Sequence, residues 1–386
     1  MINRAAESRL IKLAKQFRSV AIIGPRQSGK TTLCRKVFPN KPYVSLENPD
    51  TLAFANDDPR GFLAQFTNGA ILDEIQRAPS LFSYLQQILD ETKKRGLFIL
   101  SGSNNFLLQE NISQSLAGRI AYLKLLPLSI GELTAANKLA KSYHQSIFNG
   151  GYPEIIAKKV NSVDWYNNYL QTYVERDVRV LKNITNLSSF VKFIKLCAGR
   201  VGSQLNVTSI ANDCNIDQKT ASTWISILEA SFIVYLLKPY YTNLNKRLTK
   251  SSKLYFYDTG LACALLNIDS AKTLHTHPYT GHLFENLMVM EALKHRMNHG
   301  LQDNLYFIQD KTGNEIDIIL EEPKILKAYE CKSSATINND YFKGLLYFSK
   351  LEKINLSMNV IYGGKEIQKR SSSINIHPWF DTNLFI

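Results

Sequence analysis

The stretch VAIIGPRQSGKT, residues 20–31, matches the pattern G-x-x-x-x-G-K-[ST] from Gly24 to Thr31. A short apolar run leads into it, and residues 31–37 are compatible with a helix. Its two glycines permit backbone conformations that a Cβ forbids, so N–H groups can wrap phosphates at a helix N-terminus. We therefore predict a strand, a phosphate-binding loop and a helix. The loop residues expected to contact nucleotide are Gly24, Pro25, Arg26, Gln27, Ser28, Gly29, Lys30, Thr31 and Thr32.

Four side chains have expected roles in nucleotide chemistry. Lys30 would reach the β- and γ-phosphates, and the Thr31 hydroxyl would ligate Mg²⁺. A second apolar run, residues 70–72, ends in Asp73 and Glu74. Asp73 would hold the Mg²⁺ site, and Glu74 would polarise the attacking water as general base. The sequence therefore predicts a hydrolase of nucleoside triphosphates.

A third apolar run, residues 97–100, ends in the small polar residues Ser101, Ser103 and Asn104. In P-loop ATPases with an additional central strand, this strand end faces the γ-phosphate. We expect one of the three, with Ser103 the chosen candidate, to sense that group; the alternative is an ordinary strand-to-loop turn.

Composition excludes several classes of protein. The chain has 386 residues, 45% hydrophobic and 20% charged, which is ordinary globular usage. No run approaches the ~20 apolar residues of a membrane-spanning helix, and the N-terminus lacks a signal-peptide core. The five cysteines are scattered and form no C-x-x-C pair, so a disulfide framework is not expected. We expect a cytoplasmic protein without a membrane partner.

The positive charge is uneven. The formal net charge is +13; residues 1–150 carry 19 basic and 11 acidic side chains, 151–270 carry 14 and 9, and 271–386 carry 13 and 13. The first two-thirds of the chain would therefore attract a polyanion such as nucleic acid. The plainer interpretation is that this charge only keeps the protein in solution.

The order of these motifs resembles AAA-type ATPases. Further segments, SLAGRI at 115–120 and LPLSIGEL at 126–133, resemble a prokaryotic family that joins such a domain to a second half called domain of unknown function 4143. The resemblance implies that Arg119 contacts the γ-phosphate in cis or serves a neighbouring subunit as an arginine finger, which makes a homo-oligomer plausible. A structural salt bridge is the alternative for Arg119.

The middle of the chain contains a helix-turn-helix pattern at 207–229. Thr208 and Asp217 are expected caps of two short helices, with Asn215 at the tight turn. A hairpin from 232 to 257 would follow as a wing. Its basic residues are Lys238, Lys246, Arg247, Lys250 and Lys253.

Two uses of this winged helix remain open. In one, the second helix enters the major groove of duplex DNA and the basic wing holds phosphates. Its outward side chains would be Gln218, Lys219, Ser222, Thr223 and Ser226. In the other, the winged helix packs against another part of the chain or another protein.

The C-terminal third contains a second set of carboxylates. Glu285 lies in a helical pattern, Asp317 in a strand, and Glu330 and Lys332 in the strand that follows. A hairpin with an even-numbered loop would place Asp317 opposite Ala328, with Glu330 and Lys332 on the same face. This resembles the D…E-x-K signature of the restriction-endonuclease-like fold. The resemblance implies that Glu285, Asp317 and Glu330 ligate Mg²⁺ and that Lys332 acts on water or phosphate.

The expected fold is α/β, in three parts. Residues 1–135 form a P-loop AAA-type ATPase domain, 136–270 a helical region with the winged helix, and 271–386 an α/β restriction-endonuclease-like domain. Three functions remain open: an ATPase acting on DNA with a Mg²⁺-dependent nuclease, a nucleotide-controlled regulator with an inert nuclease fold, and an ATPase that remodels protein partners. ATP and Mg²⁺ are the expected cofactors.

Overall fold

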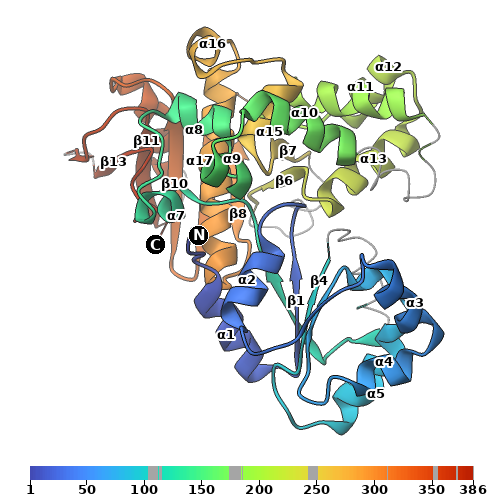
Figure 1. Ribbon diagram of the computed structural model, residues 1–386. Helices are drawn as coiled ribbons and strands as arrows, with labels where there is room; N and C mark the ends of the chain where they lie inside the picture. The colour runs from blue at the N-terminus through green and yellow to red at the C-terminus, as the bar shows by residue number, and fades with distance from the viewer. Residues whose placement is uncertain are drawn as a thin grey trace. The chain divides into compact units, whose positions relative to one another are not determined.

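The computed structural model describes residues 1–102, 112, 115–173, 184, 186–241, 251–310, 312–350, 355–370 and 373–385 (Figure 1). It divides into two compact units. The first contains Met1–Leu128 with Ala230–Phe232 and Arg296–Leu301, and the second contains Ser129–Glu229, Ile233–His295 and Gln302–Ile386. Among the described helices, none is both long and apolar enough to cross a bilayer.

A parallel sheet forms the centre of the first unit. Its strand order is β2-β3-β4-β1-β5, and every pair runs parallel. The inner strand β1, between β4 and β5, is buried along its whole length, as in sheets covered on both faces. The strands are β1 (Ser19–Ile23), β2 (Tyr43–Ser45), β3 (Ile71–Asp73), β4 (Phe98–Ser101) and β5 (Ile120–Lys124).

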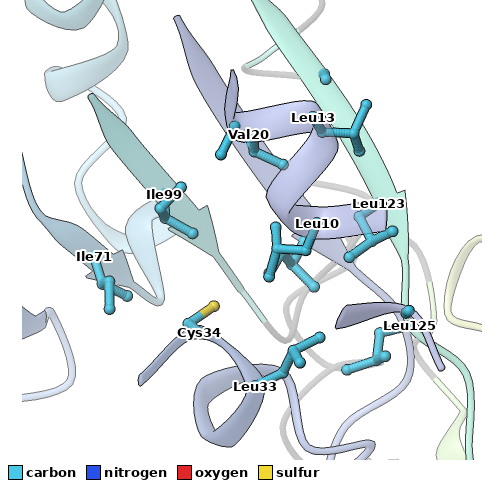
Figure 2. Packing of buried hydrophobic residues seen from close by; sticks show 13 residues of the cluster. Leu10, Leu13, Val20, Leu33, Cys34, Ile71, Ile99, Leu123 and Leu125 are labelled. Atoms are coloured by element: carbon cyan, nitrogen blue, oxygen red, sulfur yellow. The ribbon is translucent and has the colours of Figure 1, made fainter. Parts of the chain in front are cut away.

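The helices of the first unit follow the strands in the alternation that the sequence predicts. They are α1 (Glu7–Gln16), α2 (Lys30–Val37), α3 (Pro49–Asp57), α4 (Pro59–Ala64), α5 (Leu81–Glu91) and the short 3₁₀ helix η1 (Ile75–Arg77). Leu10 and Leu13 of α1 meet Val20 of β1 and Leu123 of β5 in one buried cluster (Figure 2). Full burial of each such side chain stabilises the fold by about 1.5–3 kcal/mol.

An eight-stranded mixed sheet organises the second unit, in the order β12-β13-β11-β10-β9-β8-β6-β7. Strands β10, β11 and β13 run parallel to one another, and β9 pairs antiparallel with both β10 and β8. The strands are β6 (Val234–Pro239), β7 (Lys253–Phe256), β8 (Leu305–Gln309), β9 (Glu315–Glu322), β10 (Ile325–Lys332), β11 (Leu356–Tyr362), β12 (Gln368–Lys369) and β13 (Ile374–Pro378).

The helices of the second unit accompany this sheet. They are α7 (Ile130–Ala135), α8 (Tyr143–Asn149), α9 (Pro153–Lys158), α10 (Ser162–Tyr173), α11 (Leu187–Ala198), α12 (Val207–Cys214), α13 (Gln218–Ala230), α15 (Thr259–Leu265), α16 (Ala271–Thr276), α17 (Thr280–His299), η3 (Asn339–Phe342) and α18 (Lys343–Lys350). Trp224 of α13 packs edge-on against Phe190 and Phe193 of α11, with ring centroids 5.1 and 5.2 Å apart.

The two helices of the expected helix-turn-helix are present as α12 and α13. Asn215 adopts the left-handed conformation at the turn, and Asp217 accepts from the Thr220 N–H at 2.8 Å, as expected. The expected cap at Thr208 is wrong: the cap of α12 is Asn206, whose side chain accepts from the Ser209 N–H. Asn206 precedes the first helical residue and can therefore satisfy an unpaired N–H.

One sheet crosses the domain boundary that was expected at residue 270. Strands β6 and β7 pair antiparallel, as the hairpin pattern predicts, but β6 also pairs in parallel with β8 through Lys238 opposite Tyr306. The hairpin is thus part of the eight-stranded sheet. Three basic residues of the expected wing, Lys246, Arg247 and Lys250, lie outside the described residues.

Candidate functional site

The phosphate-binding loop lies between β1 and α2. Gln27 and Gly29 have φ angles of 59° and 93°, in the left-handed region, and Gly29 caps α2. Alternating backbone conformations of this kind aim successive N–H groups into one concavity that suits an anion. The Ser28 hydroxyl is buried and has no hydrogen-bond partner among the described residues, so the loop holds a spare polar group.

Lys30 lies back over this loop. Its Nζ donates to the carbonyl oxygens of Gly24 at 2.9 Å and Pro25 at 2.8 Å. The side chain is buried, and this burial lowers the pKa of Lys30 to about 8, against the opposing charges of Glu74 and Asp73. A bound phosphate would favour the protonated ammonium and restore its charge.

Asp73 at the end of β3 is held by three hydroxyl groups. Thr31 Oγ1 donates to Asp73 Oδ2 at 2.7 Å, Tyr43 donates to the same oxygen at 2.8 Å, and Ser101 donates to Oδ1 at 2.6 Å. The structure thus brings together the two residues expected to hold Mg²⁺. A hydroxyl and a carboxylate from adjoining elements are hard oxygen ligands that fit this ion.

Ser101 lies at the end of β4, as expected. Its hydroxyl is buried and donates to Asp73, the carboxylate expected to hold Mg²⁺. Ser103, the chosen sensor, lies outside the described residues. The sequence analysis did not single out Tyr43, because it belongs to no recognisable motif. Only the pairing of β2 with β3 brings it to Asp73.

Glu74 follows Asp73 in the left-handed conformation, with φ 56°. Gln76 Nε2 donates to its carboxylate. The other polar atom of Gln76, Oε1, is buried and has no hydrogen-bond partner within the described chain. Because Gln76 is itself buried, it restricts the carboxylate that is expected to act as the general base. A non-glycine residue in this conformation costs about 1–3 kcal/mol, which is typical of functional sites.

Arg4 is a functional candidate that the sequence patterns missed. Its buried guanidinium donates to the Ser28 carbonyl and to the Leu126 carbonyl, both at 2.6 Å. It thereby ties the phosphate-binding loop to the segment that follows β5. No motif marks a basic residue so near the N-terminus, so the sequence offered no signal for it.

Arg119 lies at the amino-terminal end of the parallel strands, whereas the nucleotide loop lies at their carboxyl end. It directly precedes β5, whose Ile120 pairs with Ser19 at the start of β1, whereas the loop follows Ile23 at the end of β1. Its guanidinium forms two hydrogen bonds to Asp90 of α5, at 2.6 and 2.9 Å. The expected contact with the γ-phosphate in cis is therefore wrong, because the length of β1, five residues at about 3.3 Å per residue, separates Arg119 from the loop.

The second site is a carboxylate cluster in the second unit. It consists of Glu285 from α17, Glu315 and Asp317 from β9, and Glu330 from β10. Carboxylate oxygens of Glu285, Glu315 and Asp317 lie within 4.8 Å of one another. The expected pairing of Asp317 with Ala328 is wrong, since Ala328 pairs with Ile319 and the hairpin turns at 323–324. This even-numbered loop still keeps Asp317 and Glu330 on one face.

Lys253 supplies a cation inside this cluster. Its Nζ donates to Glu285 Oε1 at 2.8 Å and also contacts Glu315. Tyr255 donates to the same oxygen of Glu285. Lys253 is only 4% exposed, so the phosphate-binding role expected for it in a basic wing is wrong. Its position follows from β7 pairing with β6 at the sheet edge, which the local sequence does not reveal.

The other members of the cluster are also paired. Asp317 Oδ2 accepts from the Cys331 N–H at 2.7 Å, and Lys332 contacts Glu330 Oε1 at 2.6 Å. Burial, and then the charge of Asp317, raise the pKa of Glu285 to about 7 and that of Glu330 to about 8. Glu330 Oε2 is buried without a hydrogen-bond partner in the described chain, as a protonated carboxyl can be.

This cluster does not fit a divalent cation as it stands. The ammonium of Lys253 contacts two of the three carboxylates that could ligate the ion. A lysine and a metal cannot both occupy the space between the same oxygen atoms, because like charges at such a distance repel strongly. The expected ligand set also differs from the one found: Glu315 belongs to the group, and Glu330 is paired with Lys332.

Three segments of the chain match known protein families. Residues 16–134 match the family described as AAA domain, 140–272 match domain of unknown function 8612, and 280–380 match domain of unknown function 4143. The chain therefore has an N-terminal AAA domain and a C-terminal domain of unknown function 4143, which confirms the expected family resemblance. The middle segment matches a separate family.

Individual relatives carry little further information. The chain is 29% identical over 341 residues to uncharacterized proteins of Mycobacterium bovis and Mycobacterium tuberculosis, covering 86% of this chain and 74% of each. It is 22% identical over 352 residues to an uncharacterized protein of Methanocaldococcus jannaschii, covering 83% and 75%. A Walker-type ATPase of Pyrococcus abyssi aligns with 69% of this chain and 96% of its own, at 13% identity and a TM-score of 0.47.

Proposed function

We propose that the AAA domain of this chain binds MgATP and hydrolyses it to ADP and phosphate. The observation that carries the proposal is the hydrogen bond of 2.7 Å between Thr31 and Asp73, next to the buried Lys30. Two oxygen ligands for Mg²⁺ and a cation for the phosphates are thus gathered at one strand edge. The AAA-domain match supports the same function.

Each protein group has a defined task in this mechanism. The loop N–H groups and Lys30 bind the phosphates and offset their charge. Thr31 and Asp73 would hold Mg²⁺, which neutralises charge that develops on the transferred phosphoryl group. Glu74, restricted by Gln76, takes the proton of the attacking water as that water forms a bond to the γ-phosphorus and the bond to the β-phosphate oxygen breaks.

We further propose that duplex DNA controls this hydrolysis. The support is the excess of basic residues in the first two-thirds of the chain and the polar surface of α13. Gln218, Lys219 and Ser222 of that helix are exposed, while its apolar face is buried. Helix α12, the turn at Asn215, α13 and the hairpin β6–β7 follow one another in the order of a winged helix.

Steady-state ATP hydrolysis across a titration of duplex DNA, at low salt with Mg²⁺, tests both parts. Stimulation that fades with added salt supports DNA as the effector, because phosphate contacts weaken steeply with salt. Lys219→Ala should reduce the stimulation, and Lys138→Ala is the matched control in a different exposed segment. A flat response with hydrolysis present favours a protein partner. No hydrolysis in wild-type protein, or equal hydrolysis in Lys30→Ala, overturns the first proposal.

For the C-terminal part, Lys253 favours the alternative of a nuclease-like fold without cleavage. The resemblance to D…E-x-K nucleases rests on Asp317, Glu330 and Lys332. The ammonium of Lys253 occupies the position among the carboxylates where a catalytic metal ion would have to bind. DNA incubated with Mg²⁺ or Mn²⁺ should remain intact with the wild-type chain. DNA cleavage that Glu330→Ala abolishes would support the nuclease function instead.

We also propose a cytoplasmic location, supported by five buried, unpaired cysteines.

A further inference from the structure

A pocket of about 630 Å³ lies in the second unit, and none of the cluster's carboxylates is among its described lining residues. Its wall includes Ser333, Gly363 and Trp379, which directly follow β10, β11 and β13. These three neighbouring strands are parallel, so the pocket lies at their shared carboxyl edge. That edge is where open α/β sheets bind small ligands, and the volume falls within the range of small-molecule sites.

Two helices labelled in Figure 1, α8 and α16, also contribute lining residues to the pocket. His144 of α8 and His275 of α16 stack with ring centroids 4.7 Å apart and planes inclined by 28°. Burial, and then the charge of His275, lower the pKa of His144. The stacked pair places two imidazole rings beside the pocket.

Apart from the phenol of Tyr143, the ionisable groups that line the pocket are all ones that become positive on protonation. They are Lys141, His144, His275, His277 and Lys365. No aspartate or glutamate is among the described lining residues. The acids adjacent along the chain are Glu366 and Asp381, and Asp381 is paired with His377 at 2.9 Å. Hydroxyl groups of Ser142, Thr276, Ser333 and Ser334 add hydrogen-bonding capacity. This composition favours an anion.

The remaining wall is aromatic and well fixed. Tyr143 packs edge-on against Phe284 at 5.0 Å and Trp379 at 6.5 Å. A Cβ on Gly363 would lie 2.3 Å from the Ser333 carbonyl oxygen and 2.6 Å from the Tyr143 ring. Gly363 therefore lets the loops after β10 and β11 close on this ring. Its N–H also donates to the carbonyls of Lys332 and Ser334, which sets the loop before any ligand arrives.

We propose that this pocket binds a small phosphorylated molecule with a flat aromatic ring, of the size of a mononucleotide. The lysines and histidines take the phosphate, and the wall of Tyr143, Trp379 and Phe380 takes the ring. Aromatic rings pair favourably with flat ligands, and charge-assisted hydrogen bonds hold phosphate. The pocket is built entirely from the second unit, so it is a site separate from the phosphate-binding loop of the AAA domain.

Calorimetric titration of the full chain with AMP tests the proposal. The Lys30→Ala variant is used, so that binding at the AAA domain does not contribute; Lys30→Met, which keeps the unbranched stem, replaces it if Lys30→Ala does not fold. We expect one AMP per chain, displaced by inorganic phosphate. Adding Lys365→Ala or His275→Ala should weaken AMP binding about tenfold, the loss of one charge-assisted contact.

The matched control is Lys369→Ala, which removes an exposed lysine of β12 that does not line the pocket. It should leave AMP binding unchanged. The proposal is overturned if AMP does not bind, or if Lys369→Ala weakens binding as much as Lys365→Ala. Adenosine that binds as tightly as AMP would also overturn it, because the cationic groups would then have no part in recognition.

Discussion

The Nζ atom of Lys253 lies 2.8 Å from Oε1 of Glu285, although the two residues are 32 positions apart and both are buried. The same ammonium contacts Glu315. The sequence pattern predicts a metal site at this cluster, but a lysine of the same chain occupies the space between two of its carboxylates. This relationship determines what the C-terminal carboxylates can bind.

Replacing this lysine should create a metal site. In Lys253→Met, three carboxylates lose their internal cation, so we expect Mn²⁺ to bind at this cluster in the variant and not in the wild-type chain. Calorimetry with Mn²⁺ measures it, with the added change Asp317→Asn expected to abolish the new binding. Lys327→Met, which breaks an ion pair between Lys327 of β10 and Glu322 of β9, is the control. Wild-type binding that requires Asp317 would contradict this account.

The cluster also predicts a pH dependence of stability. The folded-state pKa of Glu330 is raised to about 8 from its ordinary 4.5 by burial and by Asp317. Folding therefore takes up a proton between these values, and the free energy of unfolding falls as pH rises from about 4.5 to 8. Glu330→Gln cannot ionise, so its melting temperature should fall less between pH 5 and 8.5 than that of the wild-type chain. The difference corresponds to a few kcal/mol at most, on the order of 1.4 kcal/mol per pKa unit. The exposed Glu366→Gln should follow the wild type; parallel curves for all three proteins would refute the assignment.

Glu74 and Gln76 should separate hydrolysis from binding. Glu74→Gln removes the general base and should lower kcat about 100-fold or more while ATP remains bound. Gln76→Ala frees the Glu74 carboxylate, so we expect a fall in kcat of about tenfold with little change in KM. Gln87→Ala, on the surface of α5, is the control. Equal kcat for Gln76→Ala and Gln87→Ala would show that Gln76 does not position the base.

Arg119 should act on the nucleotide of a neighbouring subunit. Its position at the edge of the sheet opposite the loop excludes its own nucleotide. Mixing Arg119→Ala with Lys30→Ala should then restore hydrolysis, because the first variant supplies an intact loop and the second an intact arginine. Asp90→Asn breaks the ion pair alone and should keep hydrolysis. Full activity of Arg119→Ala by itself would leave only the structural salt bridge.

Arg4→Ala should loosen the phosphate-binding loop. It removes two hydrogen bonds from a buried charged donor, at Ser28 and Leu126, each worth about 1.5–3 kcal/mol. We expect ATP affinity to fall about tenfold or more, measured by calorimetry. Lys12→Ala, an exposed position of α1, should change nothing. A loss of melting temperature without a loss of affinity would assign Arg4 to stability alone.

The two sites differ in how far the sequence predicts them. The nucleotide loop is contiguous, so Gly24 to Thr31 could be read directly, and Asp73 follows from one apolar run. Lys253 could not, because its burial depends on tertiary pairing: β7 pairs with β6, and β6 pairs with β8 through Lys238 and Tyr306, which are 68 positions apart. The same limitation explains Arg4 and Tyr43: each reaches the site only through tertiary contacts that leave no local pattern.

The pairing of β6 with β8 determines whether the segments 140–272 and 280–380 can be separated, in the laboratory or in evolution. The segments 140–272 and 280–380 match separate families, but their strands share one hydrogen-bonded sheet. A chain cut between them would leave the facing edges of β6 and β8 open to water, where they could pair with other chains and aggregate. We therefore expect the two segments to be inherited, and to be expressed successfully, only together as one cooperative piece.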